Sequence, residues 1–333
     1  MNEHGGRPVV VVTGASAGIG RAIAQEFGRH GWRVALLARG VDGLAGARRE
    51  VEELGGEALE LPTDVADEDQ VEAAAAAVEA AWGTIDVWVN DAMATIFTEA
   101  LSIPPADFRR ATEVTYFGTV WGTLAALRRM KPRNRGTIVQ VGSALAYRSI
   151  PLQAPYCGAK AAIRGFTDSL RSELVHDRSR VHLTMVQLSA FNTPQFDWGR
   201  TNLTKRPRPM GKIFQPELAA RAVYFAATHR RRELWVGWPA VQAIVGTKFI
   251  PGLLDEMLGR TAVDGQHTDE PLPPGRKDNL WEPVPGDHGA HGRFDAQAHA
   301  DSSQFWLTTH RTEVGLAALG LAAVAGLLFG RRG

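Results

Sequence analysis

Short apolar runs rich in β-branched residues alternate with longer segments of helical periodicity from about residue 9 to residue 237. This alternation is typical of βαβ units, which place parallel strands in one sheet and cover it with helices. We therefore expect an α/β fold, a doubly wound parallel sheet of about seven strands with helices on both faces. The predicted strands are residues 9–13, 33–38, 58–61, 86–90, 137–141, 182–187 and 233–236.

The segments between these runs predict helices. Three of them end near a glycine, Gly31, Gly55 or Gly83, and glycine commonly ends a helix because it adopts left-handed backbone angles easily. One further helix is expected over 239–260. The others are 18–29, 42–54, 67–81, 106–130, 155–176 and 216–229.

Residues 191–215 interrupt the alternation with several prolines, and we expect a long loop that covers a site as a lid. A surface irregularity without a role is the alternative. The apolar side chains of this loop could line a substrate pocket or simply pack together; they are Phe191, Phe196, Trp198, Met210 and Phe214.

The chain after residue 260 changes composition. Residues 264–303 are rich in Pro, Gly, Asp and His, which is typical of a linker and not of a core. The four histidines in this stretch are irregularly spaced and have no cysteine beside them, so we predict no metal site.

Residues 314–330, from Val314 to Gly330, are all apolar or glycine, and Arg331 and Arg332 follow them. A helix of this length spans about 25 Å, slightly less than the roughly 30 Å of a bilayer core. We expect a C-terminal membrane anchor or a re-entrant segment, with a helix buried on the protein or in a dimer as the alternative.

Charge and cysteine content limit the class of partner. The 37 basic and 36 acidic residues give a net charge of +1 without a basic run, so we expect a small-molecule partner and no nucleic acid. The single cysteine, Cys157, excludes an internal disulfide and fits a reducing compartment. The start of the chain lacks the apolar run of a secretory signal. We expect a cytoplasmic protein, associated with a membrane if residues 314–330 anchor it.

A glycine-rich turn joins the first predicted strand to the first helix. In this context glycines let the backbone approach a pyrophosphate, whose charge is met by free N–H groups and the helix dipole. A tight turn with only a structural role is the alternative. The candidate cofactor residues here are Gly14, Ser16, Gly18, Ile19 and Gly20.

Arg39 follows the second strand, at the position where an acid would bind the ribose 2′-hydroxyl of NAD. A cation at this point instead suits a 2′-phosphate. The sequence therefore favours NADP(H), unless Arg39 simply faces solvent.

The spacing of these glycines together with Tyr156-x3-Lys160 resembles the short-chain dehydrogenase/reductase family, in its compact single-domain branch, over about residues 8–240. The resemblance implies a Rossmann-type fold, so that residues 1–260 would be an NADP-binding catalytic domain, 261–311 a linker or extension, and 312–333 an apolar helix. Homo-oligomers are common in this family. Further motifs stand in the family's order: Asp64-Val65, Asn90-Asp91-Ala92, Ser143 and Thr193.

The resemblance also implies roles for these residues. Asp64 would contact the adenine, Asn90 would support the sheet and cofactor, and Thr193 would bond the carboxamide. From the residues themselves, Tyr156 and Lys160 project from one face of a predicted helix, and a nearby ammonium favours the phenolate. Ser143 can reach the same space and hydrogen-bond the reacting oxygen, while hydride comes from the nicotinamide.

Three motifs depart from the family pattern. Thr115 stands where a catalytic asparagine is usual, and the relay role of that residue depends largely on its backbone carbonyl, which threonine also has. Asp91 and Met93 replace an asparagine and a glycine, and Ser189-Ala190 replaces Pro-Gly. For Cys157, beside the tyrosine, we expect packing.

We therefore expect an NADP(H)-dependent oxidoreductase that acts on a carbonyl or alcohol, with a hydrophobic substrate suggested by the apolar tail. Two alternatives stay open. One is a membrane-tethered NADP(H) sensor without turnover, and the other is an epimerase or dehydratase on the same fold.

Overall fold

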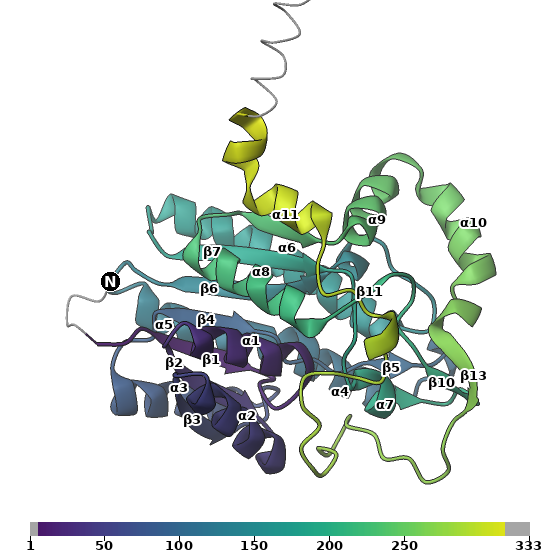
Figure 1. Cartoon of the computed structure of the whole chain (residues 1–333), viewed down its shortest axis with the longest axis horizontal. Helices are drawn as coiled ribbons and strands as arrows, with labels where there is room; N and C mark the ends of the chain where they lie inside the picture. The colour runs from purple at the N-terminus through teal and green to yellow at the C-terminus, as the bar shows by residue number, and fades with distance from the viewer. Residues whose placement is uncertain (1–5, 317–333) are drawn as a thin grey trace, which may run out of the picture.

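One parallel sheet organises the chain, and the computed structural model describes residues 6–316 (Figure 1). The strand order is β12-β7-β6-β4-β1-β2-β3, and every neighbouring pair is parallel. The direction of winding reverses between β1 and β4, and ligands of such sheets bind at the carboxyl ends of the strands there. The seven predicted strands are confirmed: β1 (Val9–Thr13), β2 (Arg33–Ala38), β3 (Glu57–Pro62), β4 (Val87–Asn90), β6 (Thr137–Ser143), β7 (His182–Leu188) and β12 (Glu233–Val236).

Helices cover both faces of the sheet. Figure 1 shows α1 and α8 side by side on one face. Alternate residues of β1 enter different apolar clusters, because Val10 and Val12 pack with α1, α2 and α8, while Val9 and Val11 pack with α3, α5 and α6. The helices are α1 (Gly18–Arg29), α2 (Val41–Glu53), α3 (Glu68–Trp82), α5 (Gly118–Met130), α6 (Ala154–His176) and α8 (Pro216–Thr228).

Two predicted helices are interrupted. The segment expected over 106–130 consists of α4 (Pro105–Thr112), a π-helical turn η2 (Glu113–Phe117) and α5. The helix expected over 239–260 is two helices, α9 (Trp238–Phe249) and α10 (Pro251–Thr261). The second prediction was wrong at Pro251, since proline has no N–H and its ring clashes with the preceding turn.

The loop expected over 191–215 contains short paired strands. β8 (Ala190–Phe191) pairs with β11 (Ile213–Phe214), and β9 (Arg200–Thr201) pairs with β5 (Ile96–Phe97). β10 (Lys205–Pro207) pairs with β13 (His267–Pro271), which follows α10. A short helix, α7 (Gln195–Trp198), and the 3-10 turns η1 (Ala100–Ser102), η3 (Ala144–Ala146) and η4 (Asp264–Gln266) complete this side of the domain.

The segment with linker composition packs against the domain. It has no helix or strand between β13 and η5 (Asp295–Gln297), which agrees with its composition, and Figure 1 shows it as a yellow-green trace along the edge of the molecule. Some of its apolar side chains are nevertheless buried, since Leu280 is 0% exposed and Phe294 is 3% exposed, whereas Trp281 is 48% exposed. The composition did not reveal this packing because isolated apolar residues among prolines and glycines have no periodicity. α11 (Ser303–Thr309) follows.

Within residues 6–316, no helix is both long enough and apolar enough to cross a membrane. The anchor predicted over 314–330 lies outside the described residues from residue 317 onward.

Leu280→Ala should lower the free energy of unfolding by about 2–5 kcal/mol, because it leaves a cavity in the apolar cluster that Leu280 forms with Val65 and with residues of α3, α5 and α6. Denaturant unfolding measures this change. Leu101→Ala is the matched control, since Leu101 is 99% exposed. Equal stability of both variants would mean that the segment does not pack in solution.

Candidate active site

A cavity of about 580 Å³ lies at the carboxyl ends of the strands, where the winding of the sheet reverses. It brings together most of the residues predicted from the sequence. Gly20, Asn90 and Thr115 are not among its lining residues. The predicted residues that line it are Gly14, Ser16, Gly18, Ile19, Arg39, Asp64, Val65, Ala92, Ser143, Tyr156, Lys160 and Thr193.

The glycine-rich turn requires glycine for two different reasons. Gly14 and Gly18 have φ of +74° and +59°, in the left-handed region that other residues disfavour. At Gly20 the reason is space, because a Cβ there would lie 2.3 Å from the Gly14 carbonyl oxygen. The turn therefore brings the first turn of α1 against the end of β1.

The amides of this turn have more partners than the sequence suggested. The Gly18 N–H donates to the Gly289 carbonyl at 3.0 Å, and the Gly20 N–H donates to the Asp91 carboxylate. Gly289 belongs to the C-terminal segment, 271 positions after Gly18. The expectation of free N–H groups is thus wrong for these two amides.

Arg39 does not simply face solvent. Its guanidinium donates to the backbone carbonyls of Asn279, Leu280 and Trp281, the last at 2.8 Å. Burial lowers the pKa of Arg39, although arginine stays charged in proteins. The carbonyls carry no net charge and orient the guanidinium at the cavity wall, while the carboxylates of Asp64 and Glu282 interact with its charge through space.

The neighbouring acid has a different environment. Asp64 lines the cavity, and its carboxylate forms an ion pair with Arg110. The Arg110 guanidinium lies 5.7 Å from the centre of the Trp281 ring and donates to the Leu280 carbonyl. The sequence analysis missed Arg110, which has no motif around it.

Ser143 and Tyr156 form a hydrogen-bonded pair. β6 ends at Ser143, and Tyr156 lies in the first turn of α6. Burial raises the pKa of Tyr156 above its usual value, and the hydrogen bond with Ser143 opposes this shift. The Ser143 hydroxyl oxygen also accepts the Leu145 N–H at 3.1 Å, which fixes its position at the start of η3. The phenol is therefore neutral at ordinary pH and holds a proton.

Lys160 lies one turn further along α6. Its Nζ is 5.6 Å from the centre of the Tyr156 ring and donates to the Val141 carbonyl at 2.6 Å. Burial lowers the pKa of Lys160 to about 8, and the charge of Asp91 limits the shift. Its charge thus lies near the phenol while its hydrogen bond goes to the sheet.

Asp91 adds a carboxyl group to the part of the cavity lined by Tyr156 and Lys160. Its backbone N–H and that of Ala92 donate to the Thr13 hydroxyl at 3.0 and 3.1 Å. Burial raises the pKa of Asp91 to about 7, against the lowering effects of Lys160 and of the Gly20 amide. An added acid was noted in the sequence, and the structure places it beside the glycine-rich turn.

Thr115 lies away from the cavity. It is 0% exposed within η2, and its hydroxyl both accepts the Ala94 N–H and donates to the Ala94 carbonyl. Its own carbonyl accepts the Thr119 hydroxyl at 2.9 Å. Neighbouring Val114 lines the cavity instead. The structure therefore gives Thr115 a packing role and does not bring it to the reacting space.

Asn90 supports the sheet from within. Its amide nitrogen donates to Thr123 at 3.1 Å and to Gln140 at 2.9 Å, and its oxygen accepts the Trp88 indole N–H. A Cβ at Gly122 would lie 2.2 Å from that oxygen, so α5 can approach only because it has glycine there.

Thr193 carries an unpaired polar atom. It is 6% exposed, and its Oγ1 has no hydrogen-bond partner within the described part of the chain. A buried hydroxyl at a cavity wall without a partner suits a ligand group that bonds it.

Part of the cavity wall is apolar. Four of the five apolar loop residues, Phe191, Phe196, Trp198 and Met210, line it, while Phe214 packs in the core. Burial raises the pKa of the Cys157 thiol, which agrees with packing. The cavity is also lined by residues of α9 and α10 that the sequence analysis did not name as site residues: Pro239, Gln242, Ala243, Leu254, Met257 and Leu258.

No group of three or more His, Cys, Asp or Glu side chains within residues 6–316 is arranged to hold a metal ion.

Asp91→Asn should raise stability above pH 7 by roughly 1–3 kcal/mol and have little effect near pH 4. The folded-state pKa is about 7, whereas an unfolded aspartate titrates near 4. The folded state therefore binds the proton more tightly, and stability falls as pH rises through this window. Thermal unfolding at several pH values measures the difference. Asp264→Asn, at an 88% exposed carboxylate, is the control; parallel pH profiles for wild type and Asp91→Asn would contradict the prediction.

Known proteins share both sequence and fold with this chain. An uncharacterised oxidoreductase of Bacillus subtilis, YxnA, is 31% identical over 283 residues, which are 84% of this chain and 79% of that protein. A metagenomic short-chain oxidoreductase solved in complex with NADP is 29% identical, with a TM-score of 0.59 over 69% of this chain and 96% of that one.

An alcohol dehydrogenase of Thermococcus sibiricus, solved with 5-hydroxy-NADP, is 27% identical, with a TM-score of 0.60 and the same coverage of 69% and 96%. The short chain dehydrogenase family matches residues 8–201. With the glycine-rich turn, the Ser143–Tyr156 pair and Lys160 gathered around one cavity, the chain belongs to the short-chain dehydrogenase/reductase family and is an oxidoreductase.

Proposed function

We propose that the protein transfers hydride between NADP(H) and a hydrophobic carbonyl or alcohol. The observation that carries this proposal is one cavity lined at one end by Arg39 and the glycine-rich turn, and elsewhere by the hydrogen-bonded pair of Ser143 and Tyr156 with Lys160. The cavity thus joins a nucleotide site to a proton donor.

The residues present fit the cofactor. The turn from Gly14 to Gly20 lets the backbone approach a pyrophosphate, although its Gly18 and Gly20 amides have partners within the chain, and the unpaired Thr193 hydroxyl suits a carboxamide. Arg39 places a guanidinium where a 2′-phosphate would lie, and two solved relatives were crystallised with NADP or 5-hydroxy-NADP. Bound NADPH would supply a hydride to the carbonyl carbon.

The chain's own residues handle the proton. In reduction, Tyr156 donates its phenolic proton to the carbonyl oxygen and becomes a phenolate, while Ser143 donates a hydrogen bond to the same oxygen. Lys160 carries a positive charge near the ring and stabilises the phenolate. Oxidation of an alcohol reverses each step.

The apolar end of the cavity supports a hydrophobic substrate. Side chains from the 191–215 loop and from α10 form it, among them Phe191, Phe196, Leu254 and Leu258. Burying apolar surface there would favour a substrate with a hydrocarbon portion by about 25 cal/mol per Å².

A sensor without turnover is the second candidate, and two observations favour it. The Asp91 carboxylate accepts the Gly20 N–H, and Thr115 lies away from the cavity. Incubation with NADPH and a carbonyl panel separates the candidates. Cofactor oxidation supports a reductase, binding without consumption a sensor, and rearrangement without net oxidation an epimerase. Homo-oligomer formation and membrane association through 314–330 remain predictions from family analogy and composition.

Tyr156→Phe should lower kcat at least about 100-fold and leave NADPH affinity within a small factor of wild type, because only the proton-bearing oxygen is removed. Steady-state kinetics and NADPH fluorescence titration measure the two quantities. Tyr116→Phe is the control, since Tyr116 does not line the cavity. Comparable turnover of Tyr156→Phe and wild type would refute the role of this residue.

Arg39→Ala should reduce the preference for NADPH over NADH by about 10- to 100-fold, because a charge-assisted hydrogen bond contributes roughly 1.5–3 kcal/mol. The ratio of kcat/KM values for the two cofactors measures it. Arg29→Ala, at a 43% exposed side chain, controls for loss of an arginine. A full NADPH preference in Arg39→Ala would exclude the 2′-phosphate assignment.

A further inference from the structure

The C-terminal segment 279–289 lines the same cavity as the glycine-rich turn. Asn279, Pro283, Val284, Gly286 and His288 are lining residues. Asn279 accepts a hydrogen bond from Arg39 and Pro283 lies beside Gly40, at the adenosine end of the proposed cofactor site, while His288 packs against Trp198 of the loop. The segment therefore forms part of the wall of this cavity.

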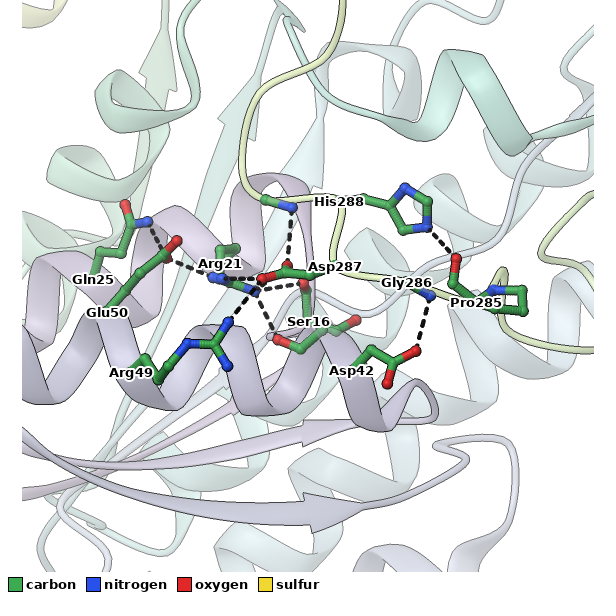
Figure 2. Close-up of polar contacts among 12 residues, drawn as sticks. Ser16, Arg21, Gln25, Asp42, Arg49, Glu50, Pro285, Gly286, Asp287 and His288 are labelled. Carbon is green, nitrogen blue, oxygen red and sulfur yellow. Dashed lines mark hydrogen bonds and ion pairs between the residues drawn. The ribbon is translucent and has the colours of Figure 1, made fainter.

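Asp287 attaches this segment to the helices behind the turn (Figure 2). Its two carboxylate oxygens accept hydrogen bonds from Arg21 at 3.1 and 3.3 Å. The Arg21 side chain is 1% exposed and also donates to Glu50 at 2.6 Å and to the carbonyls of Ser16 and Gly43. A buried guanidinium needs hydrogen-bonding and charged partners, so removal of the Asp287 carboxylate would leave part of the Arg21 charge unpaired.

Two backbone groups on either side of Asp287 add attachment points. The Gly286 N–H donates to Asp42 on α2 at 2.9 Å, and the Gly289 carbonyl accepts the Gly18 N–H. α2 leaves room for Asp287 because of Gly46, where a Cβ would lie 1.9 Å from the carboxylate. Figure 2 shows the contacts made by Asp287 and Gly286 between the segment and the two helices.

The other end of the segment is held at Arg39. The carbonyls of 279–281 accept its hydrogen bonds, and Leu280 is buried below them. The segment is thus fixed at both ends, while Pro283 and Val284 between them face the cavity.

We propose that residues 279–289 form the outer wall of the dinucleotide site, and that Asp287, acting through Arg21, is the positioning residue that holds this wall over the bound nucleotide. This inference rests on the proposed NADP(H) site. A wall that contacts the nucleotide slows its dissociation, and opening the wall breaks the Asp287–Arg21 contact.

The test is the dissociation rate of NADPH from the full chain, followed by fluorescence during a chase with excess NADP⁺. Asp287→Asn should raise this rate about tenfold and raise the NADPH Kd with it, since one charged hydrogen-bonding partner is weakened. Asp42→Ala should act in the same direction without touching Arg21, so the test survives if the first variant folds poorly.

Asp301→Asn is the matched control. Asp301 lies in the same C-terminal region and pairs with Arg221 at 2.8 Å, away from the cavity, so its variant should keep the wild-type rate. Wild-type dissociation in both folded test variants would overturn the proposal. Tighter NADPH binding would also overturn it, because it would show that Gly289 competes with the nucleotide for the Gly18 amide.

Different results would contradict the proposed function and the proposed wall. Absence of carbonyl reduction in a wild type that binds NADPH would defeat the chemistry and leave the wall intact. An unchanged dissociation rate in an active Asp287→Asn enzyme would defeat the wall and leave the chemistry.

Discussion

The buried guanidinium of Arg21 joins three parts of the chain that are distant in sequence. It donates to the Ser16 carbonyl in the glycine-rich turn, to Gly43 and Glu50 on α2, and to Asp287 in the C-terminal segment. Removing such a charge from water is unfavourable unless carboxylates and carbonyls replace its hydration. Because Arg21 follows the turn by one residue, the geometry of the nucleotide site and the position of the C-terminal segment depend on the same group.

The cavity contains a second set of ionisable groups that influence one another. Asp91, Lys160 and Tyr156 each have a pKa moved toward the neutral form by burial, to about 7 for Asp91 and about 8 for Lys160. The attraction between Asp91 and Lys160 only partly opposes this, and the Asp91 charge raises the pKa of Tyr156 further. A bound dinucleotide, which carries charge of its own, would change this balance. The neutral phenol that results is the form that can donate a proton.

The fold was predictable from the sequence because its signal is local. β1 is buried on both faces, so it appears as the continuous run Val9–Thr13, and the turn that follows it contains the glycines that its geometry requires. Ser143 and Tyr156 could also be placed, since Ser143 lies at the end of a predicted strand and Tyr156 near the start of a predicted helix. Thr115 could not, because the π-helical turn that contains it and its contact with Ala94 are tertiary features.

The C-terminal wall shows where such prediction ends. Arg21 and Asp287 are 266 positions apart, and the segment that carries Asp287 has neither helical nor strand periodicity. Its attachment to Arg39 also uses backbone carbonyls, which every sequence has, so no residue type marks it. That choice of partner has a consequence for the site. A carboxylate hydrogen-bonded to Arg39 would compete directly with a phosphate, whereas carbonyls hold the guanidinium in place and the carboxylates of Asp64 and Glu282 act on it only through space.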